Sequence, residues 1–194
     1  MSVLRVMFLA LALFAAGCSE QSVEQSDLPL LLRAGELKGY GVNIHEHERH
    51  ESFRKTRYFD GSMDVDYEFQ TPEDAPEPLY LSVTVTFERT VRDAKASYLV
   101  QRGAAVVGGK IGGIETETLQ DFFDYGDDSY FGLLKGEKGP VGNVFGARVG
   151  RKVYFTFLAG VYFDDPQDWA EWVTPKLDYM KGYNPASPPL LGLF

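Results

Sequence analysis

The chain has three histidines, His45, His47 and His50, and all of them lie in the segment NIHEHERHE. In an extended strand, residues i and i+2 point to the same side, which would place His45 and His47 together. Imidazole and carboxylate groups are ligands for Zn²⁺, Ni²⁺ and Cu²⁺, so these histidines and Glu51 form a candidate metal site. A solvated polar strand end is the simpler interpretation, because Arg49 shares the face of His45 and His47 and its charge opposes a bound cation.

A second group of potential ligands lies in the acidic segment DFFDYGDDSYF, residues 121–131. Its aspartates offer carboxylate oxygens, the ligands that Ca²⁺ prefers. Their spacing does not follow the EF-hand loop, however. Acidic residues around Gly126 fit a turn between two apolar segments, and we favour that interpretation.

Nucleophilic catalysis is not indicated by any motif in the sequence. The chain has no G-x-S-x-G motif, its one cysteine is Cys18, and all histidines fall in one segment, so no catalytic triad can be assembled. We therefore expect a protein that is not an enzyme and assign no catalytic residue. We also expect no cofactor, unless the histidine segment binds a divalent metal.

The N-terminal segment has the pattern of a secretory signal. Arg5 precedes an apolar run at residues 6–16, and Gly17 and Cys18 follow. A run of this length is too short to span about 30 Å of hydrocarbon comfortably as a helix. The segment AAGC resembles the lipobox of bacterial lipoproteins, in which cleavage makes the cysteine the first residue and acyl chains are attached to it. The resemblance implies a signal peptide at residues 1–17 and lipidation at Cys18. Residues 19–27 are polar and lack periodicity, which predicts a flexible tether, so we assign residues 18–27 to the lipidated cysteine and its tether. The alternative is an ordinary signal peptide cleaved near Gly17.

The same resemblance predicts where the protein acts. Ser19 after the cysteine implies sorting to the outer membrane of a Gram-negative cell, with the domain facing the periplasm. Each methylene of a palmitate or similar acyl chain contributes about 0.8 kcal/mol to membrane binding. Loss of Arg5 with the signal peptide leaves 18 cations against 28 anions, a net charge of −10. Such a body repels nucleic acid and anionic lipid headgroups, so we expect the acyl anchor, and not charge, to hold the protein at the membrane. The other expected partner is a protein of the cell envelope.

Turn residues and alternation predict the elements of residues 28–194, which we assign to a single domain. Two strand-like runs flank Asp60-Gly61, the dipeptide suited to a two-residue hairpin turn. That turn would place Arg57 opposite Asp64 and make one face of the hairpin charged. Residues 79–88 alternate as a strand, and Thr90 then opens a helix that ends near Gly103.

The second half of the chain repeats the order of strands followed by a helix. Strands are expected around residues 129–135 and 141–160, the latter a hairpin that turns at Gly150-Arg151. Asp165 and Pro166 open a helix with one apolar face, formed by Trp169, Trp172, Val173 and Leu177. The order predicts an α+β fold with a largely antiparallel sheet and two main helices.

The strand LYLSVTVTFER with its following helix, and KVYFTFLAG leading into DPQDWAEWVTPKLDYM, resemble the PsbP-like fold of photosystem extrinsic subunits and some bacterial lipoproteins. The resemblance implies an accessory or binding role and supplies no catalytic residue. It favours a membrane-anchored, non-enzymatic binding or accessory module. The alternative is a metal-dependent binding protein or hydrolase centred on His45 and His47. The apolar tail at residues 186–194 is expected to pack on the domain or to dock onto a partner.

Overall fold

The structure is a computed structural model that describes residues 18–42, 44, 50–72, 75, 77–111 and 113–185. The expected signal peptide, His45, His47 and the apolar tail at residues 186–194 lie outside these residues. Within the described ranges, no helix is both long and apolar enough to cross a membrane.

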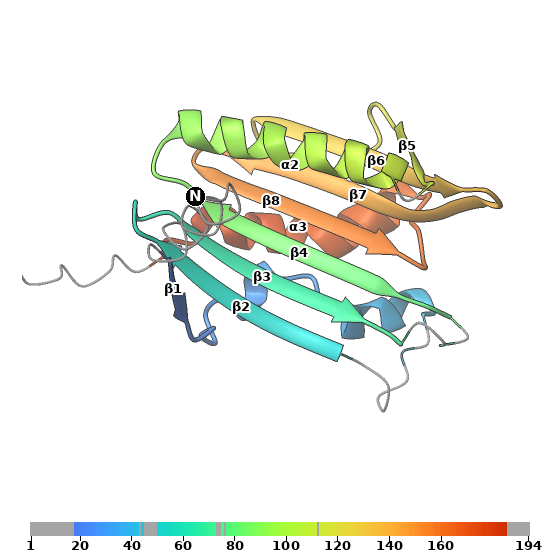
Figure 1. Ribbon diagram of the computed structural model, residues 1–194, viewed down its shortest axis with the longest axis horizontal. Helices are drawn as coiled ribbons and strands as arrows, with labels where there is room; N and C mark the ends of the chain where they lie inside the picture. The colour runs from blue at the N-terminus through green and yellow to red at the C-terminus, as the bar shows by residue number, and fades with distance from the viewer. Residues whose placement is uncertain are drawn as a thin grey trace, which may run out of the picture.

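Eight strands form one antiparallel sheet in the order β1-β2-β3-β4-β8-β7-β6-β5. The strands are β1 Cys18–Gln21, β2 His50–Tyr58, β3 Met63–Gln70, β4 Tyr80–Phe87, β5 Glu115–Thr118, β6 Asp128–Gly136, β7 Gly139–Val149 and β8 Lys152–Ala159. The helices are α2 Val91–Ile111 and α3 Pro166–Gly182, with short 3₁₀ helices η1 Leu28–Leu30 and η2 Ala34–Tyr40. Figure 1 shows α2 on one face of the sheet and α3 on the other. The expected single-domain α+β fold with two main helices is confirmed.

The larger core lies between the sheet and α3. The Asp165 side chain accepts a hydrogen bond from the backbone N–H of Gln167 and caps the helix, and Pro166 occupies its first turn. The buried residues of α3 are the four predicted from the sequence, Trp169, Trp172, Val173 and Leu177, together with Met180. A helix with one apolar stripe thus closes one face of the sheet.

The smaller core lies beneath α2, which packs on β5, β7 and β8. The N-terminal cap is the predicted one, because the backbone N–H of Asp93 donates to Thr90 Oγ1 over 3.1 Å. Ala94 and Tyr98 are buried against the sheet. The helix continues through Gly103 to Ile111, so its expected end near Gly103 was wrong. Glycine lowers helix propensity by only about 1 kcal/mol, too little to end a packed helix.

The β2–β3 hairpin differs from the prediction by one residue of register. Arg57 lies opposite Met63, and the expected Arg57–Asp64 pairing is wrong. The connection has three residues, 59–61: the Tyr58 N–H donates to the Ser62 carbonyl, and Gly61 takes the left-handed conformation at φ +92°. A shift of one residue exchanges the two faces of a strand, so Arg57 turns to the α3 side. The β7–β8 turn at Gly150-Arg151 is confirmed, with Val149 opposite Lys152.

The N-terminal segment is folded onto the sheet. Residues Cys18–Gln21 form the edge strand β1, in which Cys18 lies opposite Tyr58 of β2. Asp27 is fully buried. This arrangement differs from the flexible tether expected for residues 19–27, because an edge strand offers unpaired backbone groups to any neighbouring segment that can extend.

Candidate functional site

Strand register gathers four separate segments at one end of the sheet. Cys18 lies opposite Tyr58, and the β2–β3 loop follows directly. Met63 lies opposite Phe87, which in turn lies opposite Lys152 at the start of β8. We call this region, formed by residues 18, 57–63, 87–90 and 150–152, the Cys18 end of the sheet.

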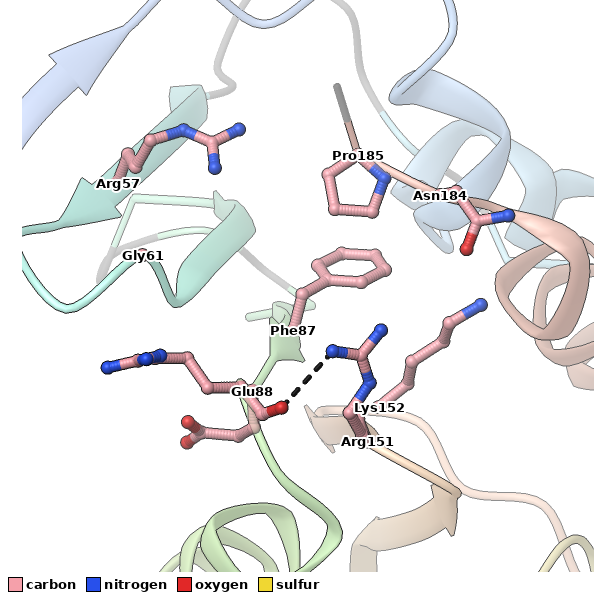
Figure 2. Close-up of a pocket in the computed structure, with 9 residues that line it drawn as sticks. Arg57, Gly61, Phe87, Glu88, Arg151, Lys152, Asn184 and Pro185 are labelled. Atoms are coloured by element: carbon pink, nitrogen blue, oxygen red, sulfur yellow. Dashed lines mark hydrogen bonds between the residues drawn. The ribbon is translucent and has the colours of Figure 1, made fainter. Parts of the chain in front are cut away.

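A pocket of about 530 Å³ opens at the Cys18 end (Figure 2). We call it the basic pocket, and its lining residues are Arg57, Gly61, Phe87, Glu88, Arg89, Arg151, Lys152, Asn184 and Pro185. Four of these side chains are cationic and one is a carboxylate, in a chain whose net charge is −9. The local charge is therefore opposite in sign to that of the whole protein and attracts anions.

Two arginines lie on different sides of the basic pocket, with Phe87 between them in the view of Figure 2. Arg57 comes from β2, and its Nη2 contacts the Met63 sulfur at 3.6 Å. Arg151 comes from the β7–β8 turn, and its Nη1 donates to the Arg89 carbonyl over 3.1 Å. That bond fixes the guanidinium and uses one of its five N–H donors. A planar fork held in this way is suited to a phosphate or carboxylate.

Lys152 and Glu88 are two further charged residues of the basic pocket, and both are held by neighbouring elements. Lys152 Nζ donates to the carbonyls of Met180, Lys181 and Tyr183 over 2.8, 2.8 and 2.6 Å, and so caps the C-terminal end of α3. Burial and the neighbouring Arg151 lower the pKa of Lys152. The Glu88 carboxylate accepts a hydrogen bond from Ser97 of α2. Glu88, the one acid among the described lining residues, is thus directed toward α2.

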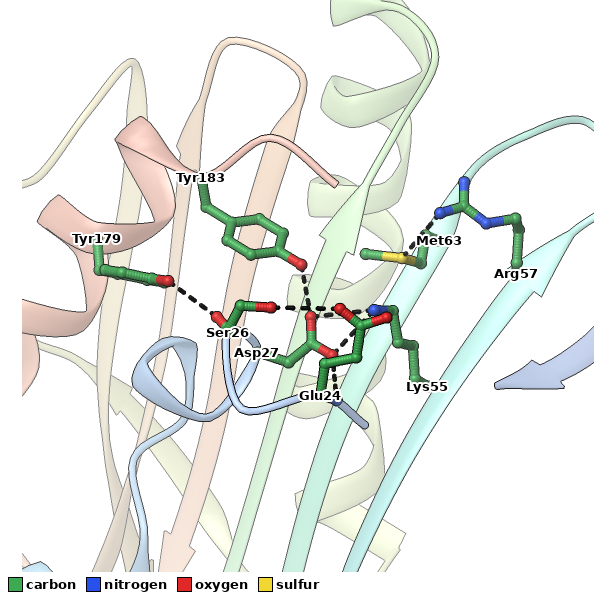
Figure 3. A network of polar contacts seen from close by, with 8 residues as sticks. All are labelled: Glu24, Ser26, Asp27, Lys55, Arg57, Met63, Tyr179 and Tyr183. Carbon is green, nitrogen blue, oxygen red and sulfur yellow. Dashed lines mark hydrogen bonds and ion pairs between the residues drawn. The ribbon is translucent and has the colours of Figure 1, made fainter. Parts of the chain in front are cut away.

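A buried ion pair between Lys55 and Asp27 stabilises the wall of the basic pocket (Figure 3). Lys55 Nζ lies 2.9 and 3.1 Å from the two carboxylate oxygens of Asp27, and Tyr183 donates its hydroxyl to the same group over 2.5 Å. The backbone N–H of Glu24 adds a bond of 2.7 Å. Burial alone would raise the pKa of Asp27, but the hydrogen bonds from Tyr183, the Glu24 backbone and Lys55 hold it below the usual value.

This network reaches the basic pocket through Tyr183. The Tyr183 ring packs on Phe87 with their centroids 5.3 Å apart, and the next residues, Asn184 and Pro185, line the pocket. The Asp27 pair therefore positions the chain that follows α3.

The predicted metal site is only partly within the described residues. His50 is exposed at the start of β2, and Glu51 accepts a hydrogen bond of 2.9 Å from the Tyr67 hydroxyl. Tyr67 is buried on the α3 side, so Glu51 faces that side and His50 the opposite one, because successive strand residues alternate. His45 and His47 lie outside the described residues. In the part of the chain that the structure describes, no three His, Cys, Asp or Glu side chains come together as a metal site.

The acidic segment at residues 121–131 has internal partners. Arg148 donates to Asp128 over 2.6 Å and to Asp127 over 3.0 Å. Asp124 accepts a bond from Ser129 over 2.8 Å. These contacts occupy oxygens that a calcium ion would need, and they support the turn interpretation.

A groove of about 610 Å³ lies on the opposite face, between α2 and the outer side of β2–β4. Its two carboxylates are engaged by neighbours. Tyr58 donates to Asp64 over 2.7 Å, and Arg54 pairs with Asp66 over 3.2 Å. Burial raises the pKa of Asp64. The charged side chains that line the groove are one cation and two carboxylates, so the basic pocket, with its four cations, is the stronger candidate for an anionic ligand.

The basic pocket was not predicted from the sequence. Each of its cations lies beside a turn or strand end, but their separation along the chain, from Arg57 to Lys152, conceals the cluster. Only the order of the strands brings them together. Comparisons of the chain with protein-family models, with curated proteins and with solved structures found no match.

Proposed function

We propose that the protein is a lipid-anchored, non-enzymatic module of the cell envelope that binds an anionic group in the basic pocket. The observation that carries the proposal is the meeting of Arg57, Arg89, Arg151 and Lys152 around one cavity in an acidic chain. Cations that meet at one place repel one another, and this repulsion lowers the free energy of unfolding of the protein. A bound anion would relieve that repulsion.

The chemistry of the lining favours a phosphate ester over a simple ion. Arg57 and Arg151 offer planar forks from two sides, and bonds between ionised partners are stronger than neutral ones. Phe87 and Pro185 supply apolar surface for the organic part of a ligand. A cavity of about 530 Å³ has room for both parts of such a ligand.

The location belongs to the same proposal. Residues 1–17 would be a signal peptide, and Cys18 would carry acyl chains that hold the domain on the periplasmic side of the outer membrane. The segment AAGC supports this, and so does the position of Cys18 in β1, which would put the anchor beside the pocket. Replacement of Cys18 by Ser should release the protein from membranes washed with carbonate. Unchanged retention would contradict the anchor.

The pocket is tested by titration of the purified protein with glycerol 3-phosphate, followed by calorimetry and by amide chemical shifts. Shifts should cluster at Arg57, Phe87 and Arg151. Arg151→Gln should weaken binding by roughly tenfold or more, since a charge-assisted bond contributes about 1.5–3 kcal/mol.

Arg54→Gln is the matched control for the loss of one arginine, because Arg54 lies on β2, the strand of Arg57, but lines the opposite groove and not the basic pocket. Its affinity for glycerol 3-phosphate should equal that of the wild type. Equal losses in both variants would indicate only a general charge effect, and no saturable binding by the wild type would refute the pocket.

A further inference from the structure

We propose that the Cys18 end docks on the phospholipid surface, with Phe59 inserted at the interface and the basic pocket holding a phospholipid phosphate. This inference rests on the proposed function, since it takes Cys18 as the anchor and the basic pocket as an anion site. It adds the identity of the ligand and the orientation of the domain.

Phe59 is presented to solvent by an ordered loop. Phe59 is 92% exposed, the largest value among the exposed large apolar residues of the described chain. The Asp60 carboxylate accepts hydrogen bonds from the backbone and the hydroxyl of Ser62, over 2.9 and 2.7 Å, and Gly61 closes the turn. A phenylalanine fixed at a hairpin tip in water gains little from burial, whereas aromatic side chains are favoured at the membrane interface.

The register of β1 places the attachment point beside this tip. Cys18 lies opposite Tyr58, the residue that precedes Phe59, and neighbouring strands are about 4.8 Å apart. Acyl chains on Cys18 would therefore enter the bilayer roughly one strand spacing from the hairpin. Because residues 18–21 are paired in the sheet, no tether separates this described part of the domain from the surface. The anchor itself would bring Phe59 to the membrane.

The distribution of charge favours the same orientation, with the Cys18 end toward the membrane. The basic pocket opens at the Cys18 end, while the chain as a whole carries a net charge of −9. Anionic phospholipids such as phosphatidylglycerol attract this end and repel the remaining acidic surface. The guanidinium groups of Arg57 and Arg151 are the groups suited to the lipid phosphates.

Tryptophan fluorescence tests the docking directly. Phe59→Trp protein, purified and reconstituted in phosphatidylglycerol vesicles that contain phosphatidylcholine brominated near the headgroup, should lose emission relative to unbrominated vesicles. Trp169 and Trp172 are buried in the core and give a constant background. Val100→Trp is the matched control, since Val100 is 69% exposed on α2 outside the Cys18 end. The emission of the Val100→Trp protein should be the same in brominated and unbrominated vesicles.

The removal of the anchor separates docking from anchoring. In the Cys18→Ser background, vesicle binding should persist weakly, depend on phosphatidylglycerol and fall with salt. Phe59→Ser in that background should reduce vesicle binding by roughly tenfold or more. Binding that is insensitive to both phosphatidylglycerol and Phe59→Ser would contradict the docking.

The outcomes of the quenching experiment also separate this inference from the proposed function. If the Phe59→Trp protein is not quenched while glycerol 3-phosphate still binds and Cys18 is lipidated, the docking is wrong and the proposed function stands. If the Phe59→Trp and Val100→Trp proteins are quenched equally, the orientation is wrong. If glycerol 3-phosphate does not bind at all, the proposed function itself fails.

Discussion

Removal of the Asp27 carboxylate should strongly destabilise the protein. Asp27 is fully buried, and Lys55 is 5% exposed. In Asp27→Ala the Lys55 ammonium would lose the carboxylate oxygens that now lie 2.9 and 3.1 Å away, and it would remain in an apolar setting. Breaking a buried ion pair from one side costs about 3–5 kcal/mol.

A double variant tests whether the unpaired charge causes this loss of stability. Replacement of both members by apolar residues of similar size, as in Asp27→Leu with Lys55→Met, leaves no unpaired charge and should cost much less than the single change. Tyr183 still loses its acceptor in the double variant, at about 1 kcal/mol. In the cycle with Asp27→Leu and Lys55→Met as the single variants, each single change leaves one buried charge unpaired, so the two single costs should together exceed the cost of the double variant by at least about 3 kcal/mol.

Urea unfolding monitored by tryptophan emission measures these free energies, because Trp169 and Trp172 lie in the core that the network closes. The reasoning fails if Asp27→Ala costs under about 1 kcal/mol. It also fails if the effects of the two single changes simply add in the double variant.

The pKa of Asp27 sets the pH dependence of the effect. Its hydrogen bonds lower the pKa in the folded protein, so ionised Asp27 contributes stability above the unfolded pKa of about 3.9. That contribution is lost as the pH falls toward the folded pKa. The stability difference between wild type and Asp27→Asn should thus be constant near neutral pH and shrink below about pH 4.

Three further changes test local features of the fold by urea unfolding. A double-mutant cycle on Arg54 and Asp66, which lie 3.2 Å apart and partly exposed, should give a coupling of roughly 0.2–1 kcal/mol, and zero coupling would contradict the observed register. Thr90→Ala should cost about 1 kcal/mol through loss of the α2 cap, while Thr90→Ser should retain most of it. Gly160→Ala should cost about 1–3 kcal/mol, since the residue has φ +96° and its Cβ would lie 2.0 Å from the Pro78 carbonyl oxygen; an unchanged midpoint would refute that contact.

Local patterns predicted the elements because each pattern had a local cause. Alternation marked β4, the Thr90 cap marked the start of α2, and the spacing of Trp169 and Trp172 marked the buried face of α3. None of these depends on a distant partner.

The dipeptide Asp60-Gly61 does not by itself determine the hairpin register, because it fits loops of two different lengths. Both a two-residue turn and a three-residue loop use Gly61 with positive φ, and the bonds from Ser62 to Asp60 favour the longer loop. The shift turned Lys55 inward toward Asp27, a contact between residues far apart in sequence that no local pattern indicates.

The basic pocket escaped prediction for a related reason. The composition is acidic overall, and the cations at Arg57, Arg89 and Arg151 are far apart along the sequence. Strand order alone makes them neighbours. In the histidine segment, period-two alternation places His50 and Glu51 on opposite sides of β2. His45 and His47 lie outside the described residues, so the metal site stays a prediction.

Hydrogen–deuterium exchange on the reconstituted protein tests the central claim most directly, because it reports every segment without a choice of mutation. Exchange is compared in phosphatidylglycerol vesicles and in detergent. The account predicts slower exchange in vesicles at three segments of the Cys18 end, namely residues 58–62 of the β2–β3 loop, residues 87–90 and residues 150–152. Protection confined to the far end of the same strands, at residues 70–72 and 136–139, or no difference anywhere, would contradict it.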